Sequence, residues 1–124
     1  MVPILVVDPD KQRLSDTASV LSRHGYCPLT ARFGGDALAL LSQLPVGVAL
    51  VDWAPSNHDH EALIGAIRRR HPGVAVVAML GSDHAHTTAR LAALGVSRSV
   101  RHPSPAASLL TAVGSCLVET LAAA

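Results

Sequence analysis

The sequence has few charged residues, only two cysteines and a single lysine, and these scarcities exclude whole classes of protein. Charged residues make up 15% of the 124 positions and hydrophobic residues 49%, a balance that excludes an intrinsically disordered chain. No apolar run approaches the ~20 residues that a membrane-spanning helix requires. Because Cys27 and Cys116 are far apart and match no metal or redox spacing, we expect neither a disulfide nor a cysteine-based site.

Strong charge and targeting signals are also missing. A net charge of +1 gives no field that would attract nucleic acid, so we expect no nucleic-acid binding by this domain alone. The segment from Met1 to Asp8 has no basic leader before its short apolar run, which argues against a signal peptide. The length suits one domain over residues 1–124. The sequence therefore predicts a single cytoplasmic domain without membrane contact.

What the chain does contain is a regular alternation of strand and helix patterns. Short apolar runs predict strands over 4–7, 26–31, 47–53, 74–80 and 96–101. Helical spacing with capping and stop residues predicts helices over about 10–24, 34–44, 60–71, 84–94 and 104–121. Helical crossovers make neighbouring strands parallel, so the predicted class is α/β, a doubly wound five-stranded parallel sheet with five helices. Pro28 suggests an edge position for the second strand.

The stretch from Gly47 to Trp53 is a buried-strand pattern that ends in one carboxylate, Asp52. In parallel sheets, ligands and chemistry gather at the carboxyl ends of the strands. The polar groups that the predicted topology brings to that edge come from four strands: Asp8, Asp10, Asp52, Ser82, Asp83, Arg101 and His102. We therefore expect the functional site at this edge.

Four motifs at this edge are the most specific in the chain: the acids after 4–7, Leu50-Val51-Asp52-Trp53, Asp59 seven residues after Asp52, and Arg101-His102-Pro103. Over essentially all 124 residues the pattern resembles the receiver domains of bacterial response regulators. The resemblance implies a flavodoxin-like fold with strand order 2-1-3-4-5 and a signalling role without enzyme activity of its own. It also implies phosphorylation of Asp52 by a histidine kinase and Mg²⁺ held by Asp8, Asp52 and a second acid.

The sequence departs from the family pattern at the metal and hydroxyl positions. Pro9 stands where the family has its second metal-binding acid, and its side chain carries no oxygen. Asp10 is a substitute ligand that equally suits the cap of the first helix. The hydroxyl position falls on Leu80, with Ser82 two residues further along. Binding of Mg²⁺ is therefore put in question.

The cation and switch positions of the family pattern are altered as well. The lysine position falls on His102, beside Arg101, and Lys11 is the only lysine in the chain. The aromatic switch position falls on Ser99. Phosphoryl transfer depends on groups that neutralise developing charge, so we predict an atypical receiver that is impaired in phosphorylation and acts through protein contacts. The alternative is a working phospho-acceptor at Asp52 with non-standard metal or cation help.

Two further features leave other interpretations open. Five histidines fall near the same edge, and imidazoles with carboxylates suit transition metals or a pH-responsive module, with His58 and His60 as the candidate ligands. The last helix is almost uncharged, and in receiver domains the fourth helix, fifth strand and fifth helix commonly form a contact face, so a homodimer or partner contact is expected there. A nucleotide or flavin binder of the same fold is disfavoured, because Asp8-Pro9-Asp10 would repel phosphate.

Overall fold

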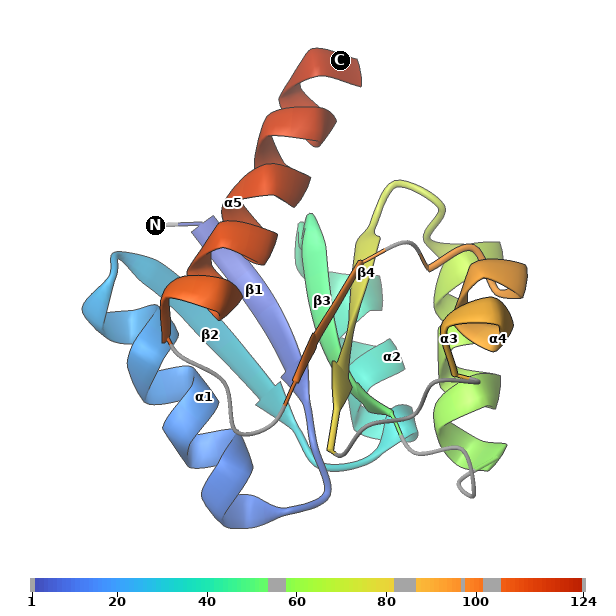
Figure 1. Cartoon of the computed structure of the whole chain (residues 1–124). Coiled ribbons are helices and arrows are strands. Elements are labelled where there is room, and N and C mark those ends of the chain that lie inside the picture. Colours follow the sequence, from blue (N-terminus) through green and yellow to red (C-terminus); the bar gives the residue numbers. More distant parts are fainter. Residues whose placement is uncertain (1, 54–57, 82–86, 97, 102–105, 124) are drawn as a thin grey trace.

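The computed structural model describes residues 2–53, 58–81, 87–96, 98–101 and 106–123 (Figure 1). Its strands are β1 (Val2–Val7), β2 (Tyr26–Ala31), β3 (Val48–Trp53), β4 (Ala75–Leu80) and β5 (Arg98–Arg101). Its helices are α1 (Lys11–Arg23), α2 (Gly34–Gln43), α3 (His58–Arg70), α4 (Thr87–Ala93) and α5 (Ala106–Ala123). Within the described residues, no helix is both long and apolar enough to cross a membrane.

All five strands form one parallel sheet in the order β2-β1-β3-β4-β5, which confirms the predicted fold class and strand order. Helices α1 and α5 cover one face, and α2, α3 and α4 cover the other (Figure 1). A separate apolar cluster fills each interface: Leu14, Leu50, Met79 and Val113 belong to the first, and Leu41, Trp53, Ile64 and Leu80 to the second. Both faces of the central strands are therefore buried, which explains their unbroken apolar runs.

Strand β2 lies at an edge of the sheet, as Pro28 predicts. The backbone N–H of Asp8 donates a hydrogen bond to the carbonyl of Ala31 over 3.1 Å. Since backbone groups alternate in direction along a strand, Ala31 and Leu29 turn their polar groups toward β1, and Pro28 turns its own toward the free edge. The missing N–H of Pro28 therefore costs the sheet no hydrogen bond.

Some boundaries differ from the prediction. Helix α3 begins at His58 rather than near His60, with Asp59 and Glu61 in a first turn that favours acids. The described part of α4 is 87–93, and the predicted start at 84 lies outside the described residues. Strand β5 begins at Arg98 instead of 96, because the N–H of Val96 donates to the carbonyl of Leu91 over 2.9 Å and closes the end of α4.

Candidate functional site

Two buried carboxylates lie side by side at the carboxyl edge of the sheet. Strands β1 and β3 pair with Val7 opposite Val51, so the next residues, Asp8 and Asp52, are neighbours across the sheet. Both alternate onto the face that α1 and α5 cover. Asp8 is completely buried, and Asp52 is 7% exposed. The strand ends thus remove two acids from water, and such charges need compensation nearby.

Arg13 supplies that compensation from the first turn of α1. Its Nε donates to Asp8 Oδ2 over 3.1 Å, and its Nη2 donates to Asp8 Oδ1 over 3.1 Å. The same Nη2 lies 3.6 Å from Asp52 Oδ2. The hydrogen bond to Asp8 and the charges of the nearby acids raise the pKa of Arg13, although burial acts in the opposite direction. One guanidinium therefore bridges both carboxylates.

Asp10 is the N-terminal cap of α1, as predicted. Its Oδ1 accepts hydrogen bonds from the backbone N–H groups of Gln12 over 2.9 Å and Arg13 over 3.1 Å. The N–H of Arg13 and the Arg13 charge hold the pKa of Asp10 below its ordinary value. The Asp10 N–H in turn donates to Asp8 Oδ1 over 2.9 Å. The carboxylate of Asp10 thus serves the helix, with Oδ2 3.9 Å from Arg13 Nη1.

His60 approaches the site from the opposite layer. It is buried in α3, and its Nδ1 lies 4.0 Å from Asp52 Oδ2. His58 is the first residue of the same helix. His58 and His60 therefore both belong to the start of a helix, and binding of a transition metal by the two histidines stays a prediction.

Leu80, the expected hydroxyl position, is the last residue of β4. Leu80 packs in the same cluster as Trp53, on the face that α2, α3 and α4 cover, and not on the face of Asp52. Met79 is the residue that pairs opposite Asp52. Because side chains alternate along a strand, continuing this alternation one residue beyond the end of β4 puts Gly81 on the Asp52 face. Gly81 has no side chain, so this position also supplies no hydroxyl.

The remaining expected residues are spread out or fall elsewhere. Ser99 is exposed on β5, and Arg101 is exposed at the end of that strand. Ser82 and His102 lie outside the described residues, as do the histidines at 84 and 86. The described site therefore consists of Asp8, Asp52, Arg13 and His60, with Asp10 at its rim.

Arg13 is the residue that the sequence analysis missed. It occupies the third position of α1 after the Asp10 cap, where helices favour an acid and disfavour a cation. A cation placed there, five residues after a strand-ending acid, is a signal that could have identified it. An arginine in a helix turn that favours acids indicates that its charge is paired with a group outside the helix.

Several solved structures have a fold similar to that of this chain. A receiver domain protein from Methanospirillum hungatei matches with a TM-score of 0.90 and 22% identity over 100% of this chain and 99% of its own. The receiver domain of NtrX from Brucella abortus matches with a TM-score of 0.82 and 27% identity over 92% of this chain and 97% of its own. The structural match is to response regulator receiver domains. A longer NtrX chain, in complex with ADP, matches over 97% of this chain but only 28% of its own length, with a TM-score of 0.88 and 26% identity. No family model and no curated protein matches the sequence.

Receiver domains typically bind Mg²⁺, and the oxygen atoms of this site do not fit that ion. Mg²⁺ requires near-octahedral oxygen ligands at about 2.0–2.1 Å. Both oxygens of Asp8 are bonded to Arg13, Pro9 offers no side-chain oxygen, and Asp10 caps α1. Among the described residues, no group of three or more histidine, cysteine or acidic side chains is placed to hold a metal.

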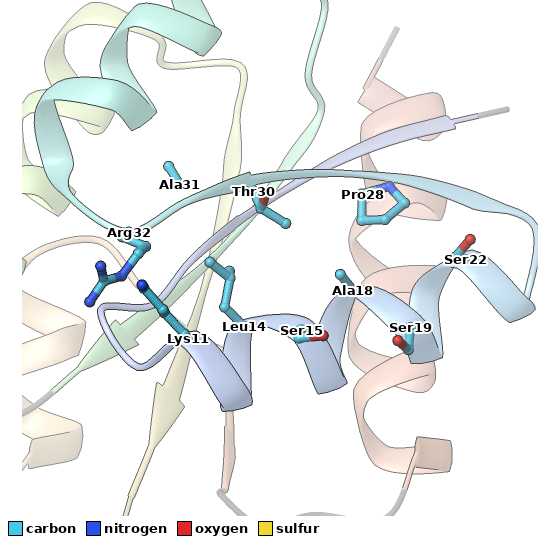
Figure 2. A pocket seen from close by; sticks show the side chains of 10 residues that line it. All are labelled: Lys11, Leu14, Ser15, Ala18, Ser19, Ser22, Pro28, Thr30, Ala31 and Arg32. Atoms are coloured by element: carbon cyan, nitrogen blue, oxygen red, sulfur yellow. The ribbon is translucent and has the colours of Figure 1, made fainter.

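A surface groove of about 650 Å³ lies beside this site, between α1 and the edge strand β2 (Figure 2). Lys11 and Arg32 stand at one end of it, and Ser22 and Pro28 at the other (Figure 2). Arg32 is held there by the carbonyl of Pro9, which accepts from its Nη2 over 2.8 Å. Neither buried carboxylate lines the groove, so it is a surface distinct from the acid pair.

Proposed function

We propose that this chain is an atypical receiver domain of two-component-type signal transduction that is impaired in phosphorylation and transmits its signal through protein contacts. The observation that carries the proposal is the state of Asp52. Its carboxylate, the candidate phospho-acceptor near the end of β3, is 7% exposed and already faces the Arg13 guanidinium. A phosphoryl donor would have to displace this contact before it could react.

The groups near Asp52 support impairment for a second reason. Phosphoryl transfer depends on preorganised charges and hydrogen-bond donors, and removal of one such group costs about 2.7–4 kcal/mol in the transition state. Pro9 and Gly81 provide neither an oxygen ligand nor a hydroxyl at the positions where they stand. The only lysine, Lys11, is at the start of α1 and lines the α1–β2 groove. Each missing group slows the same step.

A second version of the function has one observation in its favour. Arg13 places a positive charge 3.6 Å from Asp52, so the guanidinium could neutralise phosphoryl oxygens in place of a metal. Asp52 would then be a working phospho-acceptor that needs Arg13 and no Mg²⁺. In either version a histidine kinase or another signalling protein is the expected partner.

The two versions separate in a phosphorylation assay. Wild-type protein is incubated with acetyl phosphate, with and without Mg²⁺, and intact mass is measured. Asp52→Asn removes the acceptor, and Asp59→Asn is the matched control that removes a carboxylate seven residues away. For the impaired version we expect no more phosphoryl adduct in the wild type than in Asp52→Asn.

Full modification of the wild type and of Asp59→Asn, absent from Asp52→Asn, would disprove impairment. If that modification proceeds without Mg²⁺ and disappears in Arg13→Met, the second version holds. If it requires Mg²⁺, the site works as an ordinary receiver and both versions fail.

A further inference from the structure

We infer that Arg13 is a built-in cation that takes the place of the divalent metal and closes the acid pair of this domain to Mg²⁺. The inference rests on the proposed receiver function, since that function is what calls for a cation at Asp52. It adds a role for a residue of α1 that lies outside the receiver motifs of this sequence. Its test requires no phosphorylation.

The contacts of Arg13 cover the carboxylates from which a metal would be bound. Two parallel hydrogen bonds of 3.1 Å occupy both oxygens of Asp8. The guanidinium also lies 3.6 Å from Asp52 and 3.9 Å from Asp10. Bidentate pairing of this kind is the strongest form of arginine–carboxylate contact.

Backbone N–H groups also donate to the oxygens of Asp8 and Asp10. Asp8 Oδ1 accepts the N–H of Asp10 over 2.9 Å, and Asp10 Oδ1 accepts two N–H groups of α1. A divalent ion would have to expel the guanidinium to bind Asp8, and it would have to uncap the helix to bind Asp10. Mg²⁺, which gives up its own water reluctantly, is poorly suited to that exchange.

The two buried carboxylates explain why an arginine stands at position 13. A cation in the first turn of a helix opposes the helix dipole, whereas Asp8 and Asp52 carry two negative charges with almost no access to water. Although the Arg13 side chain is 42% exposed, its charged end faces the buried acids. The domain therefore balances its acid pair without a metal, and its structure is independent of divalent cations.

Thermal unfolding followed by circular dichroism tests this inference, with MgCl₂ and MnCl₂ titrated at constant ionic strength. The emission of Trp53, next to Asp52 and the only tryptophan, serves as a local second readout. The variants are Arg13→Met, which keeps length and removes charge, Arg13→Lys, which keeps charge, and Asp8→Asn combined with Arg13→Met, which removes one charge of each sign.

For the wild type and Arg13→Lys we expect no cation-specific shift in Tm or emission. Arg13→Met should melt at a lower temperature, and Mg²⁺ should restore it by roughly 5 °C for each tenfold excess of free ion over its Kd. The double variant should regain part of the lost stability and should not respond to Mg²⁺.

Two results would overturn the inference. One is a saturable Mg²⁺-specific shift in the wild type that Asp52→Asn abolishes. The other is an Arg13→Met variant that loses no stability. If Arg13→Met does not fold even with Mg²⁺, the wild-type titration and Arg13→Lys still decide the matter. Failure of the phosphorylation proposal would appear in the mass assay and leave these melting curves unchanged.

Discussion

The position of Asp8 was predicted from the sequence, but its ion pair with Arg13 was not. Its position after a four-residue apolar run identified it as an acid at the carboxyl edge, because that depends only on strand patterning. The contact of Asp8 with Arg13 depends on how the first turn of α1 faces the sheet, and the only local sign of it is a cation at a helix position that favours an acid. The sequence alone also does not show how the end of β4 registers against β3, where Met79 pairs opposite Asp52 and Leu80 packs on the other face of the sheet.

Gly81 offers a gain-of-function test of the register between β3 and β4. A Cβ built on Gly81 meets no atom of the described residues within 4 Å, so Gly81→Ser should change stability by less than about 0.5 kcal/mol. We expect the added hydroxyl to increase the adduct formed at Asp52 in the mass assay. Leu80→Ser is the matched control: it puts a hydroxyl into the opposite core, should cost about 2–5 kcal/mol, and should not increase the adduct. Equal adduct in the two variants would contradict the register.

Asp10 gives a pH-dependent prediction. Its pKa is lowered in the folded domain, chiefly by the N–H of Arg13, so its stabilising effect is fully present above its ordinary value of 3.8 and is lost as the pH falls through the folded value. Asp10→Ala should therefore lower Tm by several degrees at neutral pH. The difference from wild type should shrink below about pH 4. Asp16→Ala, another acid of α1, is the control, and an equal loss in both variants would argue against capping.

At the scale of helices and strands, the sequence predicted every element, because each strand is a continuous apolar run and most of the helices have a recognisable stop. Boundaries were predicted wrongly where a hydrogen bond from outside the element determines where it begins. Val96 closes the end of α4 through its bond to Leu91 and so cannot begin β5. Asp59 was expected in a loop and lies instead in the first turn of α3.

Two of these helix ends depend on glycine in the left-handed region. Gly25 after α1 has φ 88°, and Gly95 after α4 has φ 85°. Alanine at either position should cost about 1–2 kcal/mol in unfolding free energy, measured by urea denaturation. A Cβ at Gly95 would lie 3.0 Å from Arg68 Nε, whereas a Cβ at Gly25 would meet nothing within 4 Å in the part of the chain that the structure describes. Because the Arg68 side chain can move, Gly95→Ala should cost only slightly more unfolding free energy than Gly25→Ala. In an Arg68→Ala background, the two substitutions should cost the same.

At the scale of the whole molecule, β5 and α5 are two of the three elements, with α4, through which self-association was predicted. Arg98 of β5 and Glu119 of α5 make an ion pair, and Val118 beside it is 66% exposed. An exposed, nearly uncharged helix of this kind is a common contact surface.

If a homodimer forms through this face, Val118→Glu should weaken it by at least tenfold in Kd, because the change buries a charge. Sedimentation equilibrium of both proteins measures this. The monomer's Tm should stay unchanged, because Val118 is exposed. Phe33→Glu, a similar change at an exposed residue before α2, is the control. A monomeric wild type, or an equal effect of both variants, would rule out this face.

The edge position of Pro28 has a consequence for how the protein can fail. An exposed edge strand is a template on which a strand of another chain can form hydrogen bonds and start aggregation. The free edge of β2 presents the backbone groups of Tyr26, Pro28 and Thr30, and the middle one has no N–H to donate. A strand that added to this edge would lack one backbone hydrogen bond at its centre. Pro28 should therefore disfavour fibril growth from this side of the sheet.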